Sequence, residues 1–199
     1  MGNDVRPGAV VEQMRGLSMQ SSGRPDFDDG TINPKEQHKR EIITQLQSLG
    51  TNAIPPLVKG LNDANAQMRR NAALVLLTLA GAYEEEQPSP EKVNIRGAMP
   101  ALIKALADRD GDVRSWAAQA LGEIGSDAKA AVSALVNLLK NSDEGSRNSS
   151  CIALGNIGPA ARDALPTLKN ALKDPSRDVR QFARRAIEQI EKRPPMGFY

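Results

Sequence analysis

The sequence predicts an all-α fold: an α-solenoid that winds as a right-handed superhelix of about four helix pairs behind an N-terminal cap helix. Three observations predict it. Apolar positions recur every 33 residues through the second half of the chain. Alanine and leucine, which favour helices, dominate the same half. Aromatic residues make up only 3% of the 199 residues, fewer than a β-sandwich or β-barrel usually contains. A stack of short helix pairs explains all three, because a lone pair cannot bury its apolar stripe.

The repeat is read from three segments that align without gaps: "ALIKALADRDGDVRSWAAQALGEIG", "ALVNLLKNSDEGSRNSSCIALGNIG" and "TLKNALKDPSRDVRQFARRAIEQIE". Leu102, Leu135 and Leu168 occupy one column at a spacing of 33, and Leu57 fills the same column 45 residues before Leu102. Three more columns hold in this register: Leu61, Leu106, Leu139 and Leu172; Leu76, Leu121, Leu154 and Ile187; Leu79, Ile124, Ile157 and Ile190. Four columns at one offset indicate internal duplication.

Each copy is expected to be a short helix followed by a longer one. In "MPALIKALAD" the apolar residues follow helical spacing, and proline lies in the first turn, where it is tolerated. Gly125 and Gly158 follow the last apolar position of the longer helix, as a helix-ending glycine does. The expected boundaries are a cap helix at 35–50 and units at 51–96, 97–128, 129–161 and 162–193.

The two ends and one insertion lie outside this pattern. Residues 1–34 are rich in Gly, Ser, Asp and Pro and are expected to form a flexible tail; 194–199 form a second tail. Within the first, Val10, Val11, Met14 and Leu17 are spaced for an amphipathic turn. That turn either packs on the first repeat or serves as a self-blocking or partner-binding segment. The acidic insertion at 83–94 is expected to be a solvated loop.

The stretch "DRDGDVR" recurs as "DPSRDVR" at the turn between the helices of a unit. Acidic residues there can accept turn amides or cap the second helix, and the arginine lies in that helix's first turn. Stacking would bring each arginine close to acidic residues of its own or the next unit. We therefore predict a structural ladder, not a calcium loop, whose glycine and glutamate spacing is absent. Its members are Asp63 and Arg69, Asp108 and Arg114, Asn141 and Arg147, and Asp174 and Arg180.

The motif "DVRSWAAQALGEIG", with its weaker copies "GSRNSSCIALGNIG" and "DVRQFARRAIEQIE", resembles the short-period HEAT-like repeats found in phycobilisome lyase subunits. The resemblance spans about residues 39–193. It implies that the second helices of the units line the concave side of the solenoid. Helical spacing then predicts the partner-binding residues of that side: Asn71, Leu74, Trp116, Gln119, Ser149, Ile152, Phe182 and Arg185. The alternative for Trp116 and Phe182 is packing at the edge between repeats.

Composition narrows the function classes. The net charge is +2, and the chain has one cysteine, Cys151, and one histidine, His38, so neither a disulfide within the chain nor a Cys/His zinc site is predicted. No catalytic residue and no cofactor or metal is implied. No apolar run is long enough to cross a bilayer. A cytoplasmic location is expected, with a leader removed ahead of "MG" as the alternative.

The leading functional prediction is a non-catalytic protein–protein interaction module or scaffold that binds another protein on the concave side. The alternative, implied by the resemblance, is a chromophore lyase subunit of the phycobilisome-lyase kind. A nucleic-acid-binding protein is disfavoured: the last unit is basic, with Lys169, Lys173, Arg177 and Arg184 among its cations, but it lacks interleaved aromatic residues.

Overall fold

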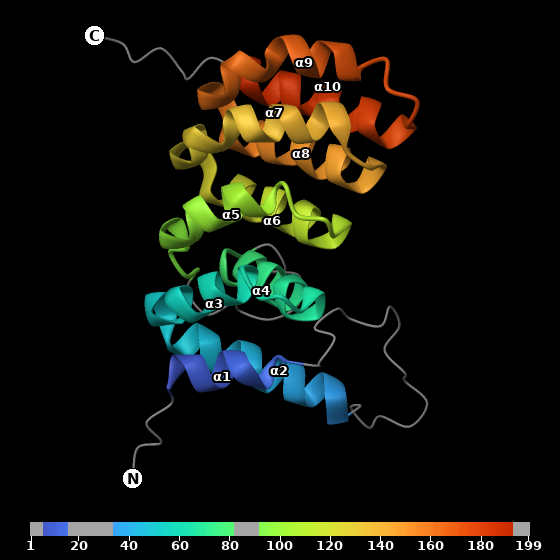
Figure 1. The fold of residues 1–199 in the computed structure, drawn as a ribbon. Coiled ribbons are helices and arrows are strands. Elements are labelled where there is room, and N and C mark those ends of the chain that lie inside the picture. The colour runs from blue at the N-terminus through green and yellow to red at the C-terminus, as the bar shows by residue number, and fades with distance from the viewer. Residues whose placement is uncertain (1–5, 16–33, 82–91, 193–199) are drawn as a thin grey trace, which may run out of the picture. The chain divides into compact units, whose positions relative to one another are not determined.

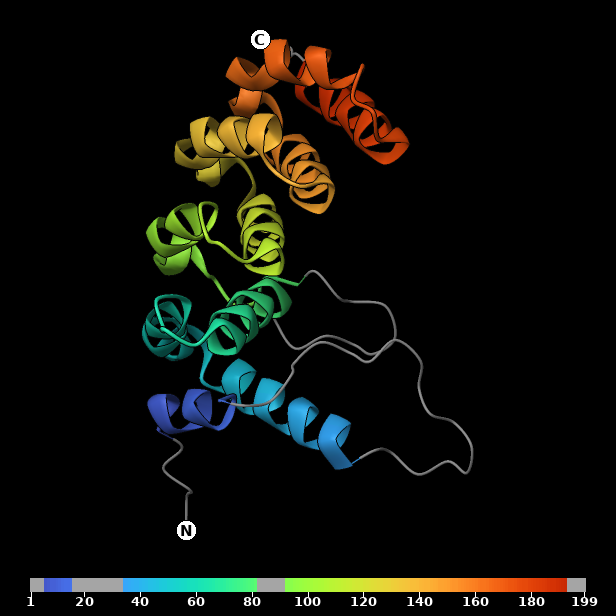
Figure 2. The same cartoon turned by 45° about the vertical axis from the view of Figure 1, so that its right-hand side comes forward.

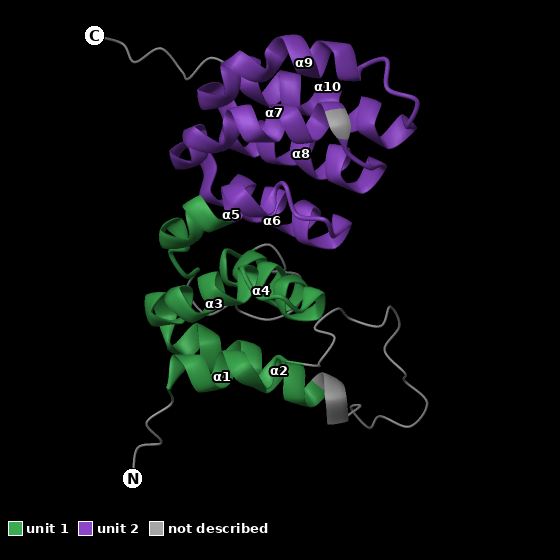
Figure 3. Cartoon of the chain, in the orientation of Figure 1, with its two compact units in different colours: residues 1–101 green, residues 102–199 purple. Residues whose placement is uncertain are grey.

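The computed structural model describes residues 6–15, 34–81 and 92–192, and these residues contain helices and turns with no strand. The chain divides into two compact units, residues 1–101 and 102–199 (Figure 3). The boundary falls inside one helix, α5 (Met99–Ala105). No helix within the described ranges is long and apolar enough to cross a membrane. Each unit is described by itself below.

The first unit holds a complete helix pair and an N-terminal addition (Figure 1). The elements in chain order are α1 (Pro7–Gln13), α2 (Pro34–Ser48), η1 (Gly50–Ala53), α3 (Ile54–Leu61), α4 (Ala66–Leu79) and η2 (Arg96–Ala98). Leu57 of α3 and Leu76 of α4 are completely buried where the pair meets. The expected cap helix at 35–50 corresponds to α2, whose Ile42 and Leu46 are also completely buried.

The second unit repeats this pair, and its longer helices lie side by side (Figure 2). The elements after α5 are α6 (Gly111–Ile124), η3 (Gly125–Ala131), α7 (Val132–Asn141), α8 (Glu144–Ile157), η4 (Gly158–Ala164), α9 (Leu165–Ala171) and α10 (Arg177–Glu191). Leu102, Leu135 and Leu168 are each 0% exposed. The column that defined the repeat in sequence is therefore a line of buried leucines, and the prediction of an all-α repeat solenoid is confirmed. The handedness of the superhelix stays a prediction.

Capping residues fix where each longer helix begins. Asn65, Asp110, Asp143 and Ser176 stand directly before α4, α6, α8 and α10, and each side chain accepts a hydrogen bond from an amide of the first turn. Such caps satisfy amides that the helix itself leaves unpaired. The capping residue in each turn thus determines where the longer helix begins.

Small residues let the longer helices of the second unit approach closely. A Cβ at Gly122 of α6 would lie 3.0 Å from the Cα of Ala153 in α8. One repeat further on, a Cβ at Gly155 of α8 would lie 3.1 Å from the Cα of Ala186 in α10. Because both distances are shorter than ordinary carbon contacts, glycine at these two positions sets the spacing between neighbouring repeats.

The expectation of a flexible tail over residues 1–34 is wrong for residues 6–15. Pro7–Gln13 form α1, and Val10, Val11 and Met14 are at most 3% exposed. The helix packs on α2 and α3. Apolar burial outweighs the ordering cost here, so the amphipathic spacing describes this segment better than its overall composition does. Leu17 and the tail 194–199 lie outside the described residues.

The acidic insertion also falls largely outside the described residues, which stop at 81 and resume at 92. Its two ends meet: the amide of Val93 donates to the carbonyl of Leu79 at 2.9 Å. The chain therefore leaves and rejoins the repeat at one place, so the extra residues do not disturb the α3–α4 pair.

Candidate functional site

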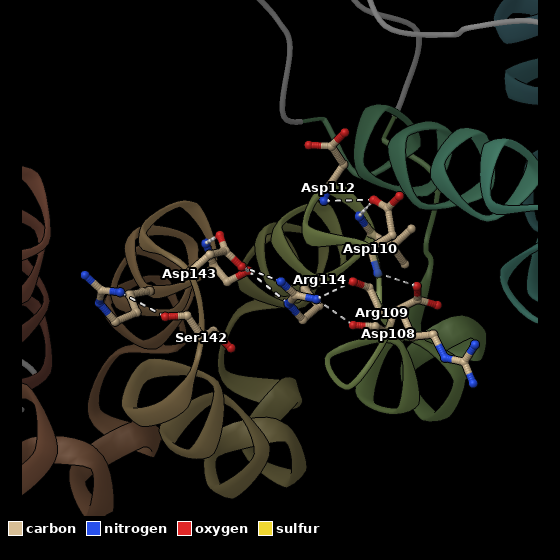
Figure 4. Close-up of polar contacts among 10 residues, drawn as sticks. Asp108, Arg109, Asp110, Asp112, Arg114, Ser142 and Asp143 are labelled. Carbon is tan, nitrogen blue, oxygen red and sulfur yellow. Dashed lines mark hydrogen bonds and ion pairs between the residues drawn. The ribbon is translucent and has the colours of Figure 1, made fainter.

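Two carboxylates of "DRDGDVR" lie in the turn between α5 and α6, where they accept hydrogen bonds from backbone amides. Asp108 accepts the amide of Asp110 at 2.9 Å, and Asp110 accepts the amides of Asp112 and Val113 at 3.0 and 3.3 Å. Asp108 thus holds the turn and Asp110 caps α6. Arg114 folds back over the turn and donates through Nη1 to the carbonyls of Asp108 and Arg109 at 2.7 and 3.0 Å (Figure 4).

The other edge of each arginine reaches the next repeat. Arg114 pairs through Nη2 with Asp143, which caps α8 (Figure 4). Arg147 repeats the arrangement with both Nε and Nη2, each 2.9 Å from an oxygen of Asp174, while its Nη1 donates to the carbonyl of Ser142 at 2.9 Å. These arginines therefore join three successive turns of the second unit.

The carboxylates of these pairs are held ionised. Burial by itself would raise the pKa of Asp143, but hydrogen bonds from the Ser146 amide and from Arg114 outweigh it and hold the pKa well below the usual range. Burial and the Arg147 hydrogen bond oppose each other in the same way at Asp174, and the pKa is again lowered. The ion pairs are consequently complete at neutral pH.

The first unit has a related contact that the spacing did not reveal. Arg69 donates through Nη1 to the carbonyls of Asp63 and Ala64, each at 3.1 Å. The carboxylate of Asp63 accepts the amide of Asn65 and also binds Arg15 at 2.8 Å. Arg15 directly follows the buried stripe of α1, which is the one sequence signal that could have suggested its role.

Two ladder positions differ from the prediction. In the third copy the ladder residue is Asp143, which pairs with Arg114 of the preceding copy, and not the predicted Asn141, whose side chain lies outside the described set. In the fourth copy Arg180 donates to the carbonyls of Asp174 and Pro175 at 2.7 and 2.9 Å. It has no carboxylate partner among the residues that the structure describes.

Two residues predicted to bind a partner are buried, and that part of the prediction is wrong. Asn71 is 1% exposed and donates to the carbonyl of Met14 at 2.7 Å. Ser149 is 4% exposed and accepts from Nε2 of Gln119 at 3.2 Å. Asn71 thus contacts the residue that follows α1, and Ser149 contacts α6 of the preceding pair. Helical spacing identifies the stripe on which these residues lie, but not the neighbour that covers it.

The remaining predicted residues of the second unit form a partly exposed patch on α6, α8 and α10. We call it the second-helix surface: Trp116, Gln119, Ile152, Phe182 and Arg185. The guanidinium of Arg185 lies over the ring of Phe182, 6.0 Å from its centroid, at the outer limit of a cation–π contact. Leu74, the corresponding residue of the first unit, is partly exposed on α4.

Each unit has a shallow hollow on the opposite side, the side of the first helices. One of about 500 Å³ in the first unit is lined by Ile54, Val58 and Gly97 among others. One of about 360 Å³ in the second unit is lined by Val132, Val136 and Asp163, which are the same repeat positions. Hollows at equivalent positions are a consequence of stacking and not a built pocket. Within the described ranges no three His, Cys, Asp or Glu side chains are grouped to hold a metal ion.

Comparison with known proteins agrees with this geometry. Residues 96–192 match the HEAT repeats family. This HEAT-repeat segment contains the last three helix pairs, with the line of leucines and both arginine–aspartate pairs of the second unit. The resemblance seen in the sequence is confirmed. No curated protein sequence matches the chain.

Solved structures with the same architecture cover nearly the whole chain. The complex of CpcE and CpcF of phycocyanin lyase from Nostoc sp. PCC7120 is 26% identical, with a TM-score of 0.61 over 97% of this chain and 68% of that chain. A designed armadillo repeat protein in complex with the peptide (KR)4 is 22% identical, with a TM-score of 0.62 over 93% of this chain and 82% of that chain, and shows the fold alone. An engineered protein is 25% identical, with a TM-score of 0.64 over 92% and 80%. The fold is one typical of protein-interaction scaffolds.

Proposed function

We propose that this protein is a non-catalytic interaction module that binds a protein partner on its second-helix surface. The observation that carries the proposal is the combination of Trp116, Ile152, Phe182 and Arg185 on three adjacent helices. Aromatic and arginine side chains are enriched among residues that dominate binding energy. Trp116, Ile152 and Phe182 are partly exposed and Arg185 is exposed, so the surface that they leave in contact with water would be dehydrated only when a partner covers it.

The rigidity of the second unit supports the same proposal. Close helix contacts at Gly122 and Gly155 and the arginine–aspartate pairs between turns hold α6, α8 and α10 in a fixed register. A surface fixed in advance loses little conformational entropy on binding. The peptide in the complex of the designed armadillo protein gives a precedent for recognition by a fold of this kind.

The test begins with a partner identified by crosslinking from this surface and then purified. Its affinity for the wild-type chain is compared with that for Trp116→Ala and Arg185→Ala. We expect each substitution to weaken binding by about 1–2 kcal/mol, as truncation of an anchor residue does. Arg162→Ala removes an exposed arginine from η4, which is not one of the three second helices, and serves as the matched control with unchanged affinity. Equal affinity of all three variants would contradict the proposal.

A second candidate is a lyase-like subunit that acts on a chromophore with a partner subunit. It rests on the similarity to the CpcE–CpcF complex, at 26% identity. Mixing the protein with a free bilin and recording the absorbance spectrum tests it. A spectral shift that saturates at one bilin per chain would favour this candidate, and an unchanged spectrum would count against it.

A further inference from the structure

Arg114 and Arg147, the two ladder arginines that pair with the next repeat, use the two sides of the guanidinium group for different contacts. The Nη1 edge is held by carbonyls of the arginine's own turn: Asp108 and Arg109 for Arg114, and Ser142 for Arg147. The edge that carries Nη2 binds the carboxylate of the next repeat. At Arg147 this edge is bidentate, with both distances to Asp174 at 2.9 Å.

Arg180 has the first contact without the second. Its Nη1 donates to the carbonyls of Asp174 and Pro175 at 2.7 and 2.9 Å, which repeats the orientation of Arg114. Within the described part of the chain no carboxylate forms an ion pair with its other edge: the carboxylate of Asp174 is close enough for Arg180 to help lower its pKa, but both of its oxygens are bound by Arg147. Its guanidinium is therefore already oriented for a carboxylate, the planar group that an arginine fork fits best.

The face of α10 around Arg180 differs from the corresponding face of the earlier repeats. Ala118 of α6 and Cys151 of α8 are each 0% exposed, whereas the third member of this column, Arg184 of α10, is exposed. The next column runs from Gly122 and Gly155 to Glu188. Charged side chains in place of small ones prevent another helix from packing here at the same short distance.

The first helix of this repeat, α9, is also followed by a residue that is more exposed than its equivalent one repeat earlier. Leu139 is 4% exposed, whereas Leu172, one repeat later in the same column, is 37% exposed. The exposed Lys173 follows it directly. Arg177, one turn before Arg180, is also exposed and has no ion pair within the described ranges. On this face the acidic groups are Glu188 and Glu191, toward the other end of α10, and Glu191 pairs with Lys169 at 3.6 Å.

We propose that Arg177, Arg180 and Arg184, the terminal arginine surface, bind an acidic peptide segment of a partner protein. One carboxylate of that segment would accept two hydrogen bonds from the free side of the Arg180 guanidinium, as the carboxylate of Asp174 does from Arg147. Neighbouring acidic residues of the segment would lie along Arg177 and Arg184. A further packed repeat does not fit, because Arg184 and Glu188 occupy the positions of small residues. This site is separate from the second-helix surface, so either proposal can fail alone.

The experiment measures fluorescence anisotropy of a labelled peptide of four Asp–Ser repeats on titration with the full chain. The uncharged peptide of four Asn–Ser repeats and a labelled single-stranded 12-nucleotide DNA are titrated in parallel. We expect saturable binding of the acidic peptide that weakens as salt is added, because exposed charges are screened. Arg180→Gln should weaken it by about tenfold, the effect of losing one bidentate charged contact.

Two further variants separate the fork from charge and from folding. Arg180→Lys keeps the charge but cannot bind a carboxylate bidentately, so we expect a loss of roughly fivefold. Arg184→Gln removes a side chain with no hydrogen bond or ion pair among the described residues, so it should fold normally and still lose affinity. Arg162→Gln, which lies outside the terminal arginine surface, should bind as wild type does. Absence of binding to the acidic peptide, tighter binding of DNA than of the peptide, or equal affinity of Arg184→Gln and Arg162→Gln would each overturn the proposal.

Discussion

Removing Arg147 tests whether the arginine–aspartate pairs hold the repeats together. Its pair with Asp174 is mostly shielded from water, with side-chain exposures of 18% and 11%. Arg147→Ala would leave the Asp174 carboxylate unpaired in that setting and also remove the hydrogen bond to Ser142. Breaking a buried pair costs about 3–5 kcal/mol, and an exposed pair contributes about 0–1 kcal/mol. Because this pair is partly hydrated, we expect Arg147→Ala to lower the free energy of unfolding by about 2–3 kcal/mol.

The assay is urea unfolding followed by circular dichroism, carried out as a double-mutant cycle with Asp174→Ala. We expect a coupling free energy of about 1–2 kcal/mol, because the two side chains contact each other directly. Lys169 and Glu191 form the matched control pair: their nitrogen and oxygen lie 3.6 Å apart, and the side chains are 60% and 51% exposed. That cycle should give at most about 0.5 kcal/mol. If the Arg147–Asp174 coupling does not exceed the Lys169–Glu191 coupling, the stabilising role of the ladder is refuted.

Three further predictions concern packing and pH. Gly155→Ala should lower the free energy of unfolding by about 1–3 kcal/mol in urea titrations, since its Cβ would lie 3.1 Å from the backbone of Ala186; Gly8→Ala, with nothing within 4 Å of its Cβ, should change it by less than about 0.5 kcal/mol. Met14→Ala should cost about 2–5 kcal/mol, because Met14 is 0% exposed; a melting temperature equal to wild type would show that α1 contributes nothing. The pKa of Asp174 is lowered from 3.8 in the folded chain, so the ionised carboxylate contributes its full share of the free energy of unfolding above that pH and loses it as the pH falls below. The Asp174→Asn variant has no such carboxylate. Its melting temperature should therefore fall less than that of wild type between pH 5 and pH 2, the range in which aspartate of the unfolded chain titrates (about 3.9).

The repeat could be predicted from the sequence because its evidence is local and recurs. Leu102, Leu135 and Leu168 share a column at a constant offset, and each is buried in the same environment. The turn chemistry is local as well: Asp110 caps the helix that begins at the next residue. Interactions within a few residues leave a spacing in the sequence, so the helix pairs and their turns could be derived without coordinates.

Contacts between segments far apart in the chain produce no regular spacing in the sequence, so they could not be predicted from it. Arg15 and Asp63 are 48 residues apart, and only the docked position of α1 brings them together. Asn71 and Ser149 lie on the predicted helical stripe, but whether a polar residue on a stripe faces solvent or a neighbouring helix depends on how repeats stack. The terminal arginine surface was also visible only in part, because Arg180 resembles the other ladder arginines until its partners are compared.

Photocrosslinking from the second-helix surface tests the central functional claim most directly. A photoreactive amino acid is placed at Ile152 on α8 in one variant and at Ser133, exposed on the first-helix side of α7, in another. Both are irradiated in the native cells, and the crosslinked peptides are identified by mass spectrometry. We predict one dominant protein attached at position 152 and none at position 133. Attachment of the same protein at position 133 alone, or no attachment at either position, would contradict recognition of a protein partner through the second helices.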